Sequence, residues 1–233
     1  MRITTSVLTV IAAVAAVAWV APSRPSQATV PAPVDCRQVK CVALTFDDGP
    51  GVATRQILRT LKKYDAKATF FVLGKQAEAH PGFVRREVRE GHQVGNHSWS
   101  HTELTKASAA TVRSEFDRTD ALLKRLTGDV PRFVRPPYGS TNATVAQAAK
   151  RPMIMWNVDT IDWKTHNPAS TLAEVKRSTK RGSIVLMHDV QPSTAQALPK
   201  VIEVLRKRGF HFVTLDELFR GQRLKDGVSY RAG

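Results

Sequence analysis

The sequence predicts an α/β fold in a single domain, and three observations support this prediction. Short apolar runs alternate with stretches of helical periodicity through residues 42–215, a pattern typical of parallel βαβ units. The chain has 233 residues, of which 42% are hydrophobic, and this is enough to enclose one full core. Polar motifs stand where the apolar runs end, and the active sites of parallel α/β folds gather at the carboxyl ends of the strands.

Seven apolar runs are expected to form strands. In chain order they are residues 42–46, 68–73, 93–95, 132–135, 153–158, 183–187 and 211–215. Apolar side chains at a spacing near 3.6 residues indicate helices between these strands. The helices are marked by Ile57, Leu58, Leu61 and Tyr64, by Val112, Phe116, Leu123 and Leu126, and by Leu198, Val201, Ile202 and Leu205.

Residues 1–28 have the pattern of an export signal. Residues 7–21 carry no charge, and a Pro- and Ser-containing stretch then leads to small residues before an expected cleavage site after Ala28. An uncleaved N-terminal anchor is the alternative, although a membrane span needs about 20 apolar residues. We therefore expect a secreted or cell-wall-associated protein. Its mature part would comprise a lead-in at residues 29–40, the folded domain at residues 41–220 and a loose basic tail at residues 221–233.

The charge balance is strongly basic. The net charge is +15 at pH 7, and cleavage after Ala28 would remove Arg2 and Arg24 and leave +13. A basic surface attracts polyanions. Export removes nucleic acid as a partner and favours an anionic cell-wall surface, while the alternative is that the charge only keeps the protein soluble. The sequence indicates no obligate protein partner.

The two cysteines of the chain stand close together, Cys36 in the lead-in and Cys41 at the start of the folded domain. In an exported protein such a pair is expected to form a disulfide that closes a small N-terminal loop. A two-thiol metal site is the weaker alternative because no histidine lies nearby in the sequence.

Two motifs supply candidate metal ligands. Asp47 and Asp48 follow the expected strand at residues 42–46, although alone they read as a turn sequence. Two adjacent carboxylates repel each other unless a cation or an arginine separates their roles, so one can bind a metal while its neighbour acts as a base. On a helical turn, His97 and His101 would share a face and hold one metal ion, although isolated pairs at this spacing are mostly solvated surface.

A third motif places Arg135 before two prolines and Tyr138. Arg135 can pair with a carboxylate of the site, and the rigid segment can direct the backbone N–H of Tyr138 at a developing oxyanion. The structural alternative is an extended turn, which the prolines favour by themselves.

The last two motifs are residues 159–163 and 186–188. Asp159 and Asp162 are either helix caps or functional carboxylates. His188 is either a buried structural imidazole or a general acid that a carboxylate orients and keeps basic. The other histidines, His80, His92, His166 and His211, have no such context and are interpreted as structural.

The order and identity of these five motifs resemble the polysaccharide deacetylases with a NodB-homology domain, carbohydrate esterase family 4. The resemblance extends from about residue 41 to about residue 218 and implies a distorted (β/α) barrel of about seven parallel strands. It implies a metal site of Asp48, His97 and His101 that holds one divalent cation, zinc or cobalt. It further implies that Asp47 is the base, that Arg135 orients this base, and that the backbone N–H of Tyr138 completes the oxyanion hole. By the same resemblance, Asp162 tunes the general acid His188. Trp163 and Leu186 would form apolar walls around the acetyl methyl.

The implied activity is metal-dependent removal of acetyl groups from an N-acetylated polysaccharide, with peptidoglycan favoured over chitin-like chains. The alternative within the same family is an O-acetyl esterase acting on acetyl-xylan. A non-catalytic wall-binding module is disfavoured because all five motifs are intact. Residues 189–192 begin a loop that varies in such families, and we expect this loop to shape substrate choice.

Overall fold

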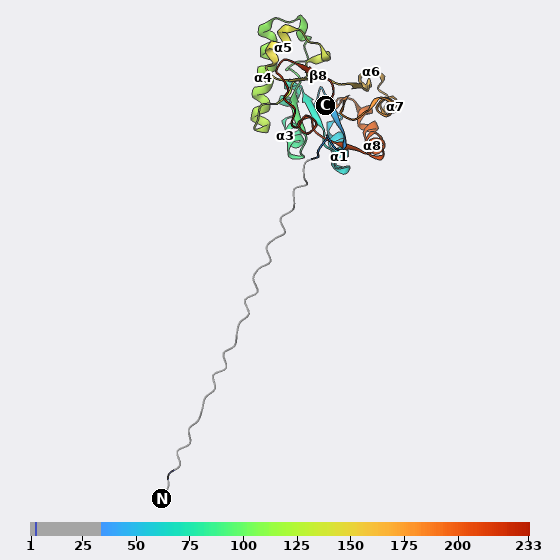
Figure 1. Cartoon of the computed structure of the whole chain (residues 1–233). Helices are drawn as coiled ribbons and strands as arrows, with labels where there is room; N and C mark the ends of the chain where they lie inside the picture. Colours follow the sequence, from blue (N-terminus) through green and yellow to red (C-terminus); the bar gives the residue numbers. More distant parts are fainter. Residues whose placement is uncertain (1–2, 4–33) are drawn as a thin grey trace. The chain divides into compact units, whose positions relative to one another are not determined.

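The computed structural model describes Ile3 and residues 34–233, shown in colour in Figure 1. Apart from Ile3, the expected export signal lies outside the described residues, as do residues 29–33 of the lead-in. Residues 34–233 belong to one compact unit with a parallel sheet inside and helices around it. Within the described part of the chain, no helix is both long enough and apolar enough to span a membrane.

The main sheet has six strands, and all of their ladders are parallel. They are β1 (Lys40–Asp47), β2 (Thr69–Val72), β3 (Gln93–Asn96), β5 (Val158–Asp159), β6 (Ser183–His188) and β7 (Phe210–Phe212). The order is β3-β2-β1-β6-β5, and β7 also pairs with β1. Single-residue parallel bridges at Val134 then connect β3 to β4 (Met153–Ile154), which pairs with β8 (Ser229–Tyr230). The strands therefore follow one another around a distorted, incompletely paired barrel.

Two of the expected strands are much shorter than predicted. Residues 132–135 pair only at Val134, and the expected strand at residues 153–158 is divided into β4 and β5. The cause of the division is the guanidinium of Arg135, which donates to the carbonyl oxygens of Ile154 (2.7 Å) and Met155 (3.0 Å). These carbonyls are thereby bound to a side chain between the two short strands.

The connections contain nine α-helices and two short 3₁₀ helices within residues 34–233. They are α1 (Thr54–Lys63), α2 (Gly74–Ala79), α3 (Pro81–Arg89), η1 (Leu104–Lys106), α4 (Ala109–Thr127), η2 (Pro137–Gly139), α5 (Ala143–Ala149), α6 (Asp162–Thr165), α7 (Pro168–Ser178), α8 (Pro192–Lys207) and α9 (Leu215–Leu218). The three helices predicted from periodicity are confirmed as α1, α4 and α8. Local chemistry sets their ends; for example, the Ser108 hydroxyl caps α4 and Gly128 ends it in a left-handed conformation.

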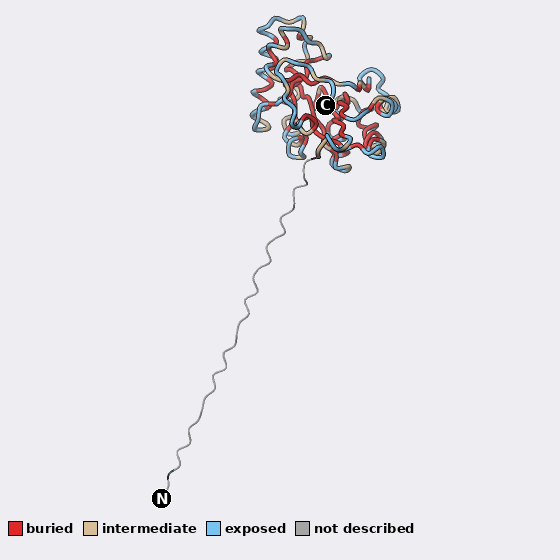
Figure 2. The backbone as a smooth tube through the Cα atoms, in the orientation of Figure 1, coloured by how far each residue is buried: buried red, intermediate tan, exposed pale blue. Residues whose placement is uncertain are grey.

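The core lies on both faces of β1. Val42, Leu44 and Phe46 pack against the surrounding helices, whereas Cys41 and Ala43 belong to the cluster inside the barrel. A strand buried on both faces reads as a continuous apolar run, and Figure 2 shows the buried backbone concentrated at the centre. Because side chains alternate along a strand, Asp47 lies on the inner face, where it reaches the barrel interior.

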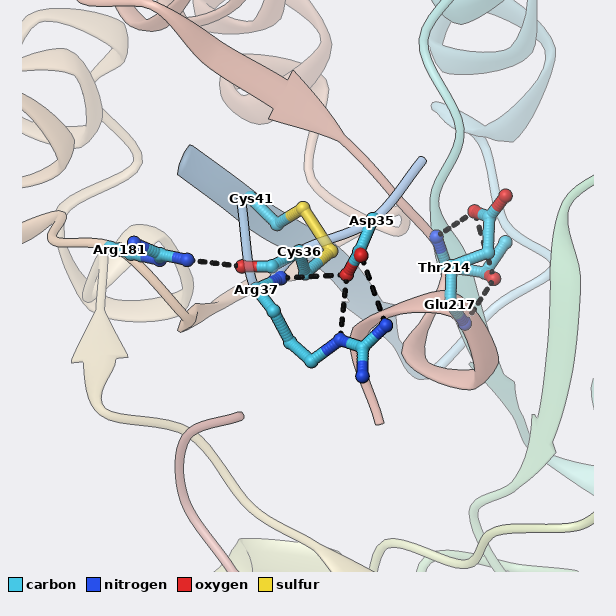
Figure 3. The surroundings of a disulfide bond; sticks show 7 residues. All are labelled: Asp35, Cys36, Arg37, Cys41, Arg181, Thr214 and Glu217. Atoms are coloured by element: carbon cyan, nitrogen blue, oxygen red, sulfur yellow. Dashed lines mark hydrogen bonds and ion pairs between the residues drawn. A yellow bond between two sulfur atoms is a disulfide. The ribbon is translucent and has the colours of Figure 1, made fainter. Parts of the chain in front are cut away.

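Cys36 and Cys41 form a disulfide (S–S 2.06 Å) at the start of β1, as predicted. Figure 3 shows its surroundings: Asp35 is paired with Arg37, and Arg181 donates to the carbonyl oxygen of Cys36 at 2.7 Å. The disulfide and Arg181 therefore fasten the lead-in beside the first strand.

The C-terminal residues are not loose, in contrast to our expectation. Strand β8 pairs with β4, and the backbone N–H of Gly233 donates to the carbonyl oxygen of Gly182 at 3.0 Å. Basic composition suggests a solvated segment, but here the carbonyl oxygens of Val228 and Tyr230 accept hydrogen bonds from the β4 region. This pairing depends on contacts between residues far apart in the sequence.

Candidate active site

The five motifs meet at the carboxyl edge of the parallel sheet. Asp47 ends β1 and His188 ends β6, and these two residues are register partners in the ladder. His97 directly follows β3, and Asp162 begins α6 just after β5. The structure therefore brings together the residues that the sequence predicted, because parallel strands align the ends of their apolar runs.

Three residues at this edge form a candidate metal centre. One ligand atom from each of Asp48, His97 and His101 lies within 4.8 Å of the others. The Asp48 Oδ1 atom is 3.4 Å from His97 Nε2 and 3.2 Å from His101 Nε2. This oxygen is buried and has no hydrogen-bond partner among the described residues. A buried carboxylate oxygen facing two imidazole nitrogens fits a divalent cation.

The electrostatics of the centre keep Asp48 ionised. Burial alone would raise the pKa of Asp48, but the imidazoles of His97, His101 and His188 lower it to about 2. His97 Nδ1 lies 2.6 Å from the backbone carbonyl oxygen of Arg135. That carbonyl can only accept, so Nδ1 carries the hydrogen and Nε2 presents its lone pair to the cluster.

The segment from His97 to His101 is an irregular loop, so the expected helical turn was wrong. Ser98 (φ 72°) and His101 (φ 62°) adopt left-handed backbone conformations. Glu115 of α4 holds the loop by accepting the N–H groups of Trp99 (2.9 Å) and Ser100 (2.8 Å). The role of Glu115 was not predicted from the sequence, because nothing in the sequence of an amphipathic helix indicates that one of its carboxylates binds a distant loop.

Asp47 and Arg135 form a buried ion pair beside the cluster. The Arg135 Nη1 group donates to Asp47 Oδ1 at 2.7 Å and to the Thr45 hydroxyl at 2.9 Å. Arg135 is fully buried, and the desolvation of its guanidinium lowers its pKa. Asp47 Oδ2 lies 3.7 Å from His97 Nε2. One carboxylate oxygen is thus held by Arg135, while the other faces the candidate metal centre.

Tyr138 lies at the mouth of the site. Its side chain is 62% exposed, and its ring stands edge-on to His101 with 4.5 Å between ring centroids. The backbone of Tyr138 is left-handed (φ 61°). The flanking N–H groups of Gly139 and Ser140 donate to the carbonyl oxygens of Pro136 and Pro137. No hydrogen bond within residues 34–233 uses the Tyr138 N–H, which therefore remains a donor for a ligand.

His188 is bound to Asp162 through two atoms. His188 Nδ1 is 2.7 Å from Asp162 Oδ1, and the His188 backbone N–H donates to Asp162 Oδ2 at 2.8 Å. The Thr194 hydroxyl also donates to Oδ2. Burial alone would lower the pKa of His188, but the hydrogen bond and charge of Asp162 raise it to about 9. Asp162 therefore favours the imidazolium form of His188, in which Nε2–H is the other donor.

The two residues expected as apolar walls differ in exposure. Trp163 in α6 is 50% exposed, whereas Leu186 in β6 is almost fully buried. The four histidines interpreted as structural are separate from the metal centre as the structure defines it. Among them, burial lowers the pKa of His92 to about 4, and its ring packs against Phe70.

Asp189 is a further residue whose place the sequence did not reveal. We expected it to begin a variable loop, but it is fully buried. Its carboxylate accepts the Thr54 hydroxyl, its N–H donates to the Asp47 carbonyl oxygen at 3.3 Å, and its carbonyl oxygen accepts from Ala53. Burial raises the pKa of Asp189 to about 7. Asp189 therefore ties the segment that follows β1 to the end of β6.

Gly49 has no room for a side chain because the Asp189 carboxylate occupies the position of its Cβ. We expect Gly49→Ala to displace the segment carrying Asp48 and to lower metal affinity and acetate release by about 10- to 100-fold, the range seen when a ligand loses its orientation. Gly82→Ala is the matched control because a Cβ at Gly82 would contact nothing within 4 Å. Equal behaviour of the two variants in zinc titrations would contradict the expectation.

This chain is similar in sequence to known proteins. A family model described as polysaccharide deacetylase matches residues 35–153. Peptidoglycan-N-acetylglucosamine deacetylase PgdA from Listeria monocytogenes is 44% identical over 207 residues, which cover 88% of this chain but only 44% of that protein. The chain thus spans less than half the length of this curated relative.

Two solved structures extend the comparison over most of the chain. The structure titled "T48 deacetylase with substrate" has a TM-score of 0.82 at 42% identity and covers 84% of this chain and 99% of that one. A family 4 acetyl xylan esterase from Clostridium thermocellum, in complex with a cobalt ion, has a TM-score of 0.78 at 36% identity and covers 83% and 98%. With the fold, the five motifs and the family model in agreement, this chain belongs to the polysaccharide deacetylases, carbohydrate esterase family 4.

Proposed function

We propose that this chain is a metal-dependent hydrolase that removes acetyl groups from the N-acetylated amino sugars of peptidoglycan. The observation that carries the proposal is the pairing of Asp47 and His188 at the ends of adjacent strands, next to the cluster of Asp48, His97 and His101. A carboxylate base and a protonated imidazole are the two groups that amide hydrolysis needs on either side of the carbonyl carbon. The deacetylase relative supports the choice of substrate.

Asp48, His97 and His101 would hold the cation, and we propose zinc or cobalt. Such an ion lowers the pKa of bound water and polarises a carbonyl group. Asp47 is placed to take a proton from the attacking water, with Arg135 fixing the orientation of its carboxylate. The free N–H of Tyr138 would donate to the oxygen that gains charge as the tetrahedral intermediate forms.

His188 completes the reaction by giving its Nε2 proton to the leaving nitrogen. An amine is a poor leaving group until it is protonated, so this step matters more for an amide than for an ester. Asp162 holds Nδ1 and therefore directs Nε2 away from itself. Exposed Trp163 and Tyr138 would contact the sugar chain at the mouth of the site, and Leu186 would limit the space for the acetyl methyl.

We further propose that the protein works outside the cytoplasm, in contact with the anionic cell wall. The export pattern of residues 1–28, the excess of basic residues and the Cys36–Cys41 disulfide support this location. The identity of the Listeria relative as a peptidoglycan deacetylase is consistent with it.

The decisive experiment measures acetate release from peptidoglycan, chitin oligomers and acetyl-xylan, with and without added zinc or cobalt. We expect metal-dependent release that is fastest from an N-acetylated substrate. The second candidate function is O-acetyl esterase activity, which the similarity to the acetyl xylan esterase favours. Faster release from acetyl-xylan than from every N-acetylated substrate would establish that function instead.

A further inference from the structure

Basic side chains stand at the C-terminal ends of the long helices, toward the edge of the sheet opposite the active site. Each of the five longest helices, α1, α3, α4, α7 and α8, carries two Lys or Arg residues in its last turn. None of these helices has an acidic residue in its first turn. Cations at helix C-termini are favourable for each helix, but here the same arrangement recurs five times.

The topology gathers these helix ends on one face. All ladders of the main sheet are parallel, so each long helix returns the chain to the beginning of a following strand. The last turns therefore lie at the amino edge of the sheet, which we call the foot, and the catalytic residues lie at the carboxyl edge. The helices surround the sheet in Figure 1, so their ends are distributed around the foot.

Few of these cations are neutralised by carboxylates. Within residues 34–233, two of the ten are in ion pairs, Arg86 with Glu90 and Arg177 with Glu174. Nine of the ten side chains belong to exposed residues. Three further cations, Lys180, Arg181 and Arg208, follow α7 and α8, whereas Asp65, Glu90 and Asp129 are the acidic residues that follow α1, α3 and α4. At these helix ends the foot therefore carries more positive than negative charge, although Asp35, Asp216 and Glu217 also lie at this edge.

The chain also enters the domain at the foot. The described range begins at Val34, and the disulfide and Arg181 fix the adjacent lead-in at the start of β1. In the sequence, the charge-free residues 7–21 precede Val34 by twelve residues, which reach about 40 Å when extended. Where this segment is retained as the uncleaved N-terminal anchor, its insertion in a bilayer would keep the foot within reach of the lipid surface.

We propose that the foot docks on an anionic phospholipid membrane and leaves the active site directed away from the lipid, toward the wall. Stable membrane association commonly combines one hydrophobic element with a polybasic patch, and the sequence and the foot supply one of each. Each Lys or Arg near an anionic surface contributes about 1 kcal/mol, or about fivefold in binding. This inference uses the proposed location outside the cytoplasm and the uncleaved form of the N-terminal segment, but not the proposed substrate.

The test compares two triple variants of the full chain with equal net charge. The foot variant carries Lys62→Gln, Lys176→Gln and Lys207→Gln. The control variant carries Lys75→Gln, Lys106→Gln and Lys164→Gln, which lie near the carboxyl edge, after β2, β3 and β5. All six lysines are exposed, and none is in an ion pair within residues 34–233. Co-sedimentation with phosphatidylglycerol–phosphatidylcholine vesicles and with pure phosphatidylcholine vesicles measures binding.

We expect the foot variant to bind the anionic vesicles on the order of 100-fold more weakly than the wild-type chain, and the control variant to lose less than about fivefold. Acetate release from small oligosaccharides by the foot variant should be unchanged, so failure of the docking proposal is distinguishable from failure of the proposed activity. Equal losses in both variants, or equal binding to neutral and anionic vesicles, would overturn the proposal. If the foot variant loses binding to soluble polyphosphate but not to vesicles, the partner is a wall polyanion instead.

Discussion

Asp48→Asn is expected to weaken the binding of a divalent cation by more than about 100-fold, whereas Asp47→Asn is expected to retain the cation and lose activity. Asp48 Oδ1 is the buried, unpartnered oxygen that faces His97 and His101, and residues that only orient a ligand already contribute about 10- to 100-fold. Asp47 is held by Arg135 through one oxygen. Its replacement removes a base, whose contribution to rate is about 10²- to 10⁴-fold.

Calorimetric titration of metal-free protein with zinc measures the first effect, and acetate release at saturating zinc measures the second. Asn at position 47 keeps a carbonyl oxygen for Arg135, but removing one charge of a buried pair costs about 3–5 kcal/mol of folding free energy in other proteins. Thermal unfolding of both variants is therefore measured as well, and the titrations are carried out at a temperature at which both variants are folded. Equal loss of zinc binding in the two folded variants would show that the roles of Asp47 and Asp48 are misassigned.

The position of the site at the carboxyl edge of the sheet could be predicted from the sequence, because this prediction needs only local sequence patterns. Apolar runs such as residues 42–46 end at polar motifs, and parallel pairing then aligns the ends. The predictions failed where long-range contacts decide the structure. The strand expected at residues 153–158 is interrupted by the guanidinium of Arg135, and β8 exists only because it pairs with β4.

Within the site, the candidate catalytic and metal-binding residues were easier to predict from the sequence than the residues that hold them in position. Residue type and spacing identify His97 and His101, but not the left-handed loop between them. Glu115 holds that loop from α4, and Asp189 joins the ends of two strands. Both are carboxylates whose role depends on burial and on partners distant in the sequence, and a single sequence contains no periodic or spacing signal for either.

Asp162→Asn is expected to lower the turnover of N-acetylated substrates by about 10²- to 10⁴-fold, close to the loss expected for His188→Ala. Asn carries no negative charge to stabilise an imidazolium, and the burial of His188 would then move its pKa from about 9 toward or below the ordinary value of 6.5. The general acid must be protonated. We therefore expect the activity of the wild-type enzyme to fall with rising pH as His188 loses its proton, and the activity of the variant to fall at lower pH. The same raised pKa stabilises the fold below pH 6.5, and this contribution disappears as pH rises through about 9.

The pH dependence of acetate release from an N-acetyl oligosaccharide, compared between wild type and Asp162→Asn, measures the shift. A bound cation adds positive charge near His188 and moves both profiles in the same direction, so the difference between the two profiles isolates the effect of Asp162.

An activated acetyl ester is the matched substrate, because its leaving group departs without a proton. Both His188→Ala and Asp162→Asn should therefore slow its hydrolysis far less than the hydrolysis of the amide. If both variants slow the ester and the amide equally, His188 acts before the leaving group departs. Its role is then to position the substrate or the metal centre, and the assignment as general acid fails.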